Sequence, residues 1–340
     1  MPFLQSRPRL LLLALFALAV LAACLGLASG TIAIPLGHLP RALAGSDPEE
    51  SAVIVQLRLP RVLLGLLVGA ALGQAGAAMQ ALFRNPLAEP GLIGVSAGAA
   101  LSAAIVLTTL QNAHVASWSP FLLPVSAFVG GLAATWAVVQ LGRSQGLTRM
   151  STLLLAGAAV NAFVAAATGL LATLASDTSL RGFTLWMFGS LGRAGWTEIA
   201  CTAPLILLPL FWLPRQARAL DALLLGEAEA AHLGVAVERL KRRVLLLAVL
   251  ATGGAVALAG LIGFVGLLVP HALRLLGGPE HRSVLPGSAL LGGALLCLAD
   301  AAARSAAPPT ELPVGLLTAL LGAPFFLALL MRGRGRAELL

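Results

Sequence analysis

The chain has 340 residues, of which 59% are hydrophobic and only 11% are charged, and its mean hydropathy is +0.94. This composition leaves too few polar side chains to cover a water-soluble surface, so it excludes an ordinary soluble domain and indicates a polytopic membrane protein. The formal net charge of +8 does not indicate nucleic acid, because the basic residues lie in short connections without an aromatic and basic stripe. We therefore expect no nucleic-acid partner and a chain embedded in the lipid bilayer.

Apolar runs long enough to cross a bilayer recur along the chain, since a transmembrane helix needs roughly 20 apolar residues. The first run follows Arg7 and Arg9, and its Leu-Ala-Ala-Cys sequence ending at Cys24 is typical of a lipoprotein cleavage site. Because the run continues to Ala28, we expect a retained first helix, with lipidation as the alternative. Eight clear spans are predicted at 10–28, 62–82, 92–110, 120–141, 152–174, 199–213, 284–303 and 313–331.

One longer apolar stretch, residues 244–276, leaves the number of spans open, because its glycines and Pro270 fit either one span with a re-entrant tail or two short spans. The placement of lysine and arginine decides between nine and ten spans, because cytoplasmic connections carry the excess of positive charge. Ten spans put 16 of the 22 basic residues inside and 6 outside, whereas nine spans would give 12 and 10. We therefore predict an all-α fold, a single domain over 1–340 with about ten transmembrane helices and both termini in the cytoplasm.

The longest cytoplasmic connection, residues 214–243, has the pattern of two short helices that meet at Gly226. Glu227 and Glu229 would lie in the first turn of the second helix, where the helix dipole favours acidic side chains, and Gly234 would end it. Apolar residues that we expect to be exposed on these helices, such as Leu223, Leu224 and Leu233, indicate a docking element for a cytoplasmic partner. A connector that rests on the membrane surface is the alternative.

If this membrane protein is a transporter, the residues that it lacks indicate where its energy comes from. Ion-coupled carriers place ionisable groups in mid-membrane, but here only four acidic residues approach a span and all lie near an end: Glu89, Glu198, Asp300 and Glu311. A phosphate loop needs Gly-Lys-Ser/Thr, and the only lysine, Lys241, precedes arginine. We therefore expect ATP to be hydrolysed by another subunit, with no catalytic residue and no metal site on this chain. A proton-coupled carrier and an intramembrane enzyme are the alternatives.

Long motifs after the first span resemble one known family. They are RLPR at 58–61, QALFRNPLAEPGLIGVSAG at 80–98, LGE at 225–227 with HLG at 232–234, GFVGLLVPH at 263–271, AD at 299–300 with Arg304, and ELPVG at 311–315 with GAP at 322–324. The chain is similar to the FecCD or BtuC-like permeases of type II ATP-binding-cassette importers, which import iron chelates, haem and cobalamin.

The resemblance implies an assembly in the bacterial inner membrane. Two copies of the ten-helix subunit would enclose a pathway, two cytoplasmic ATPase subunits would supply the energy, and a periplasmic binding protein would deliver the substrate. Coupling helices at about 219–234 would rest in a groove of the ATPase and transmit its motion. The residues implied at this contact are Asp221, Leu224, Leu225, Gly226, Glu227, Glu229, His232, Leu233 and Gly234.

Three outer arginines, Arg58, Arg61 and Arg304, match positions that in this family receive acidic residues of the binding protein. The charge distribution independently leaves these three on the face where positive charge is scarce. A guanidinium can hold a carboxylate bidentately, which gives orientation as well as attraction. Anchoring to lipid headgroups is the alternative interpretation.

The expected substrate is haem, because the motifs at 80–94, 185–192 and 226–234 look most like those of haem permeases. Ferric siderophores and then cobalamin are the alternatives. A haem pathway would be largely apolar with a cation near its entrance, and Arg181 is the candidate partner of a propionate. Asn161 and Met150 are further pathway candidates, although a hydrogen bond to a neighbouring helix and ordinary packing are the simpler interpretations. No histidine pair is evident, so we expect transient passage without iron ligation and no permanently bound cofactor.

Overall fold

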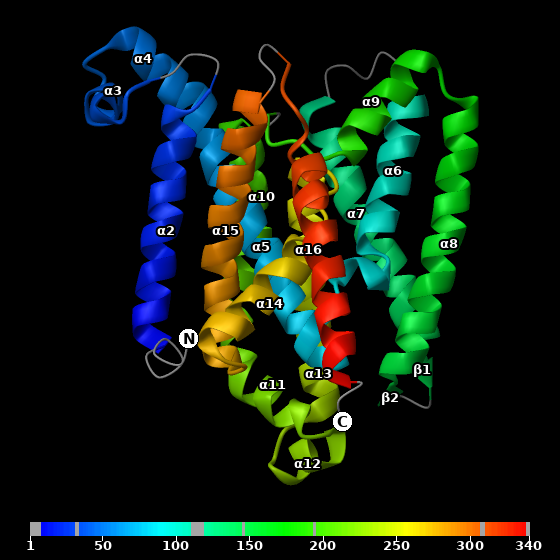
Figure 1. Cartoon of the computed structure of the whole chain (residues 1–340). Coiled ribbons are helices and arrows are strands. Elements are labelled where there is room, and N and C mark those ends of the chain that lie inside the picture. The colour runs from blue at the N-terminus through cyan, green and yellow to red at the C-terminus, as the bar shows by residue number, and fades with distance from the viewer. Residues whose placement is uncertain are drawn as a thin grey trace.

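The computed structural model describes residues 8–30, 34–109, 119–144, 147–192, 195–306 and 310–337. These residues form a bundle of helices that stand side by side (Figure 1). The longer helices are α2 (Pro8–Ala28), α5 (Leu59–Phe83), α6 (Val95–Thr109), α7 (Ser119–Leu141), α8 (Met150–Leu174), α10 (Trp196–Trp212), α13 (Val237–Ala259), α14 (Val265–Gly277), α15 (His281–Ala306) and α16 (Val314–Ala337).

Short elements join the long helices at the two ends of the bundle. The α-helical ones are α3 (Leu39–Leu43), α4 (Pro48–Ala52), α9 (Asp177–Met187), α11 (Ala217–Leu224) and α12 (Glu227–His232). Single turns of other helix types are η1 (Leu36–His38), η2 (Val53–Arg58), η3 (Pro90–Ile93) and η5 (Pro214–Gln216). A small antiparallel hairpin pairs β1 (Arg143–Ser144) with β2 (Leu147–Thr148).

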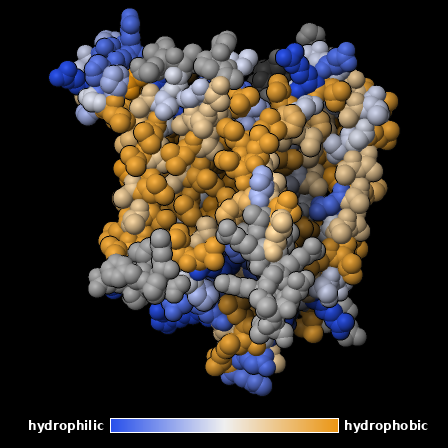
Figure 2. Space-filling model, in the orientation of Figure 1, coloured by the Kyte–Doolittle hydropathy of each residue, from blue (hydrophilic) through white to orange (hydrophobic). Residues whose placement is uncertain are grey.

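The bundle has two distinct ends. We call the end with α11, α12 and the β1–β2 hairpin the inner end, and the opposite end with α3, α4 and α9 the outer end (Figure 1). Figure 2 shows a broad hydrophobic band between more hydrophilic ends on the face in view. Among the described residues, seven helices are long and apolar enough to cross a membrane, and α6, α14 and α16 contribute three shorter apolar helices. Together they confirm the predicted all-α fold with about ten spans.

The long apolar stretch 244–276 folds as two helices. α13 ends at Ala259, and Gly260 then takes a φ of 72°, a conformation that favours glycine. A Cβ added to Gly260 would lie 2.2 Å from the carbonyl oxygen of Trp186, so only glycine fits against that backbone. α14 has 13 residues and spans about 20 Å, so the non-helical turn before it lies at depth within the protein. Pro270 lies inside α14 without ending it.

The core is built around α5. In the most apolar stretch of 18 residues, 83% is buried for the helix that contains α5, against 67% for both α13 and α15. Glycines let the neighbouring backbones approach: a Cβ on Gly69 would lie 2.1 Å from the Gly292 oxygen on α15, and one on Gly76 would lie 2.0 Å from the Gly266 oxygen on α14. α8 is the least buried long span, at 17%, so most of its apolar surface is left for lipid or a second subunit.

Candidate functional site: an outer arginine network and an inner coupling element

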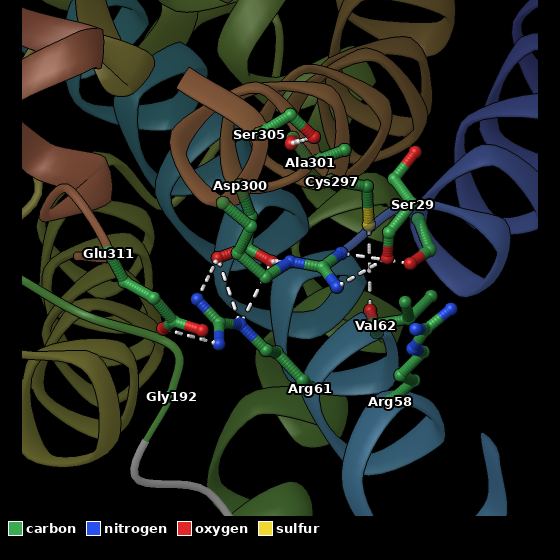
Figure 3. A network of polar contacts seen from close by, with 12 residues as sticks. Ser29, Arg58, Arg61, Val62, Gly192, Cys297, Asp300, Ala301, Ser305 and Glu311 are labelled. Carbon is green, nitrogen blue, oxygen red and sulfur yellow. Dashed lines mark hydrogen bonds and ion pairs between the residues drawn. The ribbon is translucent and has the colours of Figure 1, made fainter. Parts of the chain in front are cut away.

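The three predicted docking arginines come together at the outer end, since Arg61 and Arg304 share Asp300 and Arg304 lies near Arg58. Figure 3 labels Arg58, Arg61 and Asp300. Arg58 is the last residue of η2, Arg61 lies in the first turn of α5, and Arg304 lies in the last turn of α15. Asp300, one turn before Arg304, joins two of them. Arg61 donates through Nε and Nη2 to the Asp300 carboxylate at 2.9–3.1 Å, and Arg304 Nε lies 3.1 Å from Asp300 Oδ2. At Arg61, the bidentate carboxylate expected of a binding protein is thus supplied by the chain itself.

Glu311 is the second acidic partner of Arg61. Arg61 Nη1 donates to Glu311 Oε2 at 2.8 Å. The Glu311 side chain is 47% exposed, whereas that of Asp300 is 4% exposed. Because an exposed ion pair is weak and a buried one is costly to break, Glu311 is the partner that another carboxylate can displace most easily.

Arg58 and Arg304 hold the outer end of α2. Arg58 Nη1 donates to the carbonyl oxygens of Leu27 and Ala28 at 2.7 and 3.1 Å. Arg304 donates to the carbonyl oxygens of Gly26 and Ser29 at 2.8 and 2.9 Å. The last carbonyls of a helix have no partner within the helix, and cations are favoured there. Both side chains are buried, so in this conformation they serve the fold, and their docking role stays a prediction.

The network contains residues that sequence reasoning did not assign to a site. The sequence places Asp300 and Glu311 near span ends and within the family motifs, without a role as partners of the predicted arginines, yet they bind them. The spacing of Asp300 and Arg304, four residues apart on one helix, was an available signal. The pairing of Arg61 with Glu311, 250 residues apart, had no local signal.

The inner end carries the predicted pair of short helices. α11 and α12 meet at Gly226, whose φ of 134° favours glycine, and Glu227 and Glu229 lie in the first turn of α12. α12 projects away from the bundle (Figure 1). Leu224, Leu225 and Leu233 are exposed, Leu225 by 68%, and Glu229, His232 and Gly234 are exposed as well. The element therefore presents apolar side chains beyond the inner end, as expected of a docking surface.

α11 is fixed to the bundle at Asp221. The Asp221 carboxylate accepts a hydrogen bond from the backbone N–H of His281 at 3.1 Å and lies 2.6 Å from His281 Nδ1. Leu220 and Leu223 of α11 are buried in the main core. The prediction that Leu223 is exposed is therefore wrong, because this side chain lies on the face of α11 that packs against the bundle. One face of α11 thus packs on the bundle while Leu224 faces outward, so Asp221 anchors the element from inside.

α12 is fixed through Lys241 of α13. Lys241 Nζ donates to Glu227 Oε2 at 2.7 Å, to Glu238 Oε1 at 3.0 Å and to the Thr148 carbonyl oxygen at 2.9 Å. Glu238 in turn accepts the backbone N–H of Thr148 at 3.1 Å. The Lys241 side chain is only 3% exposed, and its three hydrogens have three acceptors. One buried ammonium therefore joins α12, the start of α13 and the hairpin that precedes α8; we call this the Lys241 junction.

The predicted pathway residues lie at different depths and do not form one site. Arg181 is exposed on α9 at the outer end. Asn161, midway along α8, donates through Nδ2 to the Gly91 carbonyl oxygen at 3.2 Å, which is the interhelical hydrogen bond expected as the simpler interpretation. Met150 begins α8 at its inner end and packs against the main core. Of the three, Arg181 alone is exposed.

Comparison with known proteins identifies the relatives of this arrangement. A model of the FecCD transport family matches residues 17–332. The hemin transport system permease protein HmuU of Yersinia pestis is 43% identical over 97% of this chain and 98% of that protein. The cobalamin import system permease protein BtuC of Halobacterium salinarum is 45% identical over 85% of this chain and 76% of that protein. The iron(3+)-hydroxamate import system permease protein FhuG of Bacillus subtilis is 36% identical over 96% of this chain and 98% of that protein.

A solved structure gives the same result for the fold. It is described as an inward-facing conformation of an ABC transporter of the metal-chelate type, and it superposes with a TM-score of 0.84 at 31% identity, covering 94% of this chain and 98% of that one. The match extends from the first span to the last, so both ends of the bundle described above fall within it. The chain belongs to the FecCD transport family.

Proposed function

We propose that the chain is the permease subunit of an ATP-driven importer that carries haem from a periplasmic binding protein across the bacterial inner membrane. Two copies form the pathway, and two separate ATPase subunits bind at the inner end. The observation that carries this proposal is the coupling element, which exposes Leu224, Leu225 and Leu233 beyond the bundle while Asp221 and Lys241 fix it to α15 and α13. A rigidly held apolar projection is suited to receive force from a partner.

Coupling would pass through the Lys241 junction. When the ATPase moves α12, the ion pair between Glu227 and Lys241 moves the start of α13. The bonds from Lys241 and Glu238 to Thr148 pull the hairpin in the same direction. Since α8 begins two residues after Thr148, a displacement of α12 reaches the least buried span without passing through the packed core. Buried, fully satisfied polar contacts are stiff enough for this role.

Docking of the binding protein would use the outer network. An acidic side chain of the binding protein would replace Glu311 on Arg61, because Glu311 is the exposed carboxylate of the network. Such an exchange keeps every guanidinium paired and therefore avoids the cost of a buried unpaired charge. Arg58 and Arg304 would provide the positive field that steers the acidic partner to this position.

Haem is favoured as the substrate by the 43% identity to a hemin permease over nearly the full length of both chains. The relative named for ferric hydroxamate supports ferric siderophores as the second candidate, and the relative named for cobalamin supports cobalamin as the third. Arg181, exposed at the outer end, would meet a haem propionate at the entrance. Asn161 and Met150 would contribute to the wall of the pathway rather than to a lasting site.

The test is uptake by the complete complex in proteoliposomes. With haem and its binding protein outside and ATP within, haem should accumulate, vanadate should stop it, and a protonophore should not. The same vesicles offered a ferric hydroxamate with its binding protein should accumulate less than one tenth as much. Uptake that follows the proton gradient without ATP would overturn the importer assignment, whereas ATP-driven uptake of the hydroxamate alone would overturn only the haem assignment.

A further inference from the structure

A groove with a cavity volume of about 350 Å³ lies between α7 and α13 near the inner end. Arg143 and Arg242 lie at its inner end, at the end of α7 and the start of α13. The groove extends from these arginines to Leu132 on α7 and Val249 on α13. Leu132 is 11 residues from Arg143 and Val249 is 7 residues from Arg242, or roughly 16 and 10 Å along the helices. Its walls are apolar and comprise Leu132, Trp136, Val139, Leu245, Leu246 and Val249. The groove therefore combines a basic mouth with an apolar floor.

The two arginines at the mouth are available to an anionic ligand. Both side chains are exposed, and neither forms an ion pair with any residue in the described ranges. The groove lining includes no acidic side chain from those ranges. The nearby Glu238 is already held by Lys241 and Thr148. Among the described residues, no acidic side chain thus compensates the positive charge at the mouth.

Thr135 gives a second, independent sign of an occupant. It lines the groove and is only 6% exposed, yet its hydroxyl has no hydrogen-bond partner in the part of the chain that the structure describes. A threonine inside a helix ordinarily bonds a carbonyl one turn earlier, and a buried unpaired hydroxyl is destabilising. A ligand that brings an oxygen acceptor into the groove would satisfy it. Trp136, at the wall, is a residue type enriched at membrane interfaces.

We propose that this groove binds an anionic phospholipid of the inner leaflet. The phosphate lies between Arg143 and Arg242, one acyl chain follows the apolar floor between α7 and α13, and an ester oxygen, deeper than the phosphate, accepts from Thr135. Basic pockets between spans on the cytoplasmic side are suited to such headgroups. Arg143 also pairs across the hairpin with Thr148, an acceptor in the Lys241 junction. On the proposed function, a bound lipid would therefore stiffen the hairpin ahead of α8.

Native mass spectrometry of the full-length protein tests the site directly. Phosphatidylglycerol and phosphatidylcholine with identical acyl chains are added separately, and inorganic phosphate is added as a competitor. The wild-type protein should retain phosphatidylglycerol preferentially. R143Q and R242Q should each weaken retention about five-fold, and T135V should weaken it less. R243Q removes the same charge from an exposed position on α13 that does not line the groove, so it should change nothing.

The steric variant L246W keeps the charge and places a bulky ring in the groove at an exposed position, so it should also release the lipid. Equal retention of the two lipids, or R243Q acting as strongly as R242Q, would overturn the proposal. Displacement of the lipid by inorganic phosphate at equal concentration would reassign the arginines to a free anion. If R143Q and R242Q instead weaken capture of the ATPase subunit while lipid retention is unchanged, the groove faces that subunit. None of these readouts depends on the transported substrate.

Discussion

Lys241 Nζ lies 2.7 Å from Glu227 Oε2, so the only lysine of the chain fastens α12 to the first turns of α13. The same ammonium holds the carbonyl of Thr148, 93 residues away in the sequence. This one side chain thus links the surface proposed for the ATPase to the inner end of the least buried span.

Replacing Lys241 by Met should separate ATP hydrolysis from transport. Methionine keeps most of the volume but removes all three hydrogen bonds, so α12 can move without the hairpin. The two carboxylates are partly exposed and can be hydrated, so the loss of stability should stay near 1–2 kcal/mol. We expect substrate transported per ATP to fall at least five-fold in proteoliposomes while the ATPase rate stays within two-fold.

Two controls accompany this measurement. K241R keeps the charge and should retain most of the coupling, and E50Q removes a carboxylate from the exposed His38 pair at the outer end and should have no effect. Parallel loss of hydrolysis and transport in K241M would show a merely structural lysine, and normal coupling in K241M would rule out the junction as the route.

Replacing Asp300 by Asn should destabilise the protein strongly. The buried Asp300 carboxylate lies between Arg61 and Arg304, and its removal leaves Arg304 without this carboxylate and Arg61 with the exposed Glu311 as its acidic partner. Breaking a buried ion pair in this way costs about 3 kcal/mol or more, whereas E311Q at the exposed end of the same network should cost less than about 1 kcal/mol. Thermal unfolding in detergent should therefore show a large decrease for D300N and a small one for E311Q. Similar decreases would mean that Asp300 is effectively solvated.

The sequence was sufficient for the features that depend on local pattern. The spans follow from apolar length, and the pivot at Gly226 follows from a glycine that precedes acidic residues. The end of α13 could not be predicted in this way, because it is fixed by the approach of Gly260 to the Trp186 carbonyl. The pairing of Arg61 with Asp300, 239 residues away, and that of Lys241 with Thr148, 93 residues away, likewise could not be predicted from local pattern.

Replacing Glu89 by Gln should change how stability depends on pH. Glu89 lies in the connection between α5 and α6, and burial of its carboxyl raises its pKa above the ordinary value of 4.5. A raised pKa means that folding favours the protonated form, so this contribution is complete below pH 4.5 and is lost as the pH rises through the folded-state pKa. The melting temperature of wild type relative to E89Q should therefore fall from pH 4 to pH 8. A difference that grows toward low pH would contradict this expectation.

Replacing Glu311 by Gln should strengthen docking of the binding protein. Glu311 occupies Arg61 Nη1 at 2.8 Å, and an incoming carboxylate has to displace it, so a neutral amide should lower that barrier and raise affinity about three- to ten-fold at low salt. D177N removes the same charge from an exposed position on α9, also at the outer end, and separates this exchange from a general change in field. Binding of the soluble binding protein to each surface-immobilised permease variant measures the affinities of E311Q and D177N. If E311Q and D177N raise the affinity equally, electrostatic steering alone explains the gain. If E311Q instead weakens binding, Glu311 contacts the binding protein itself and does not yield its place on Arg61.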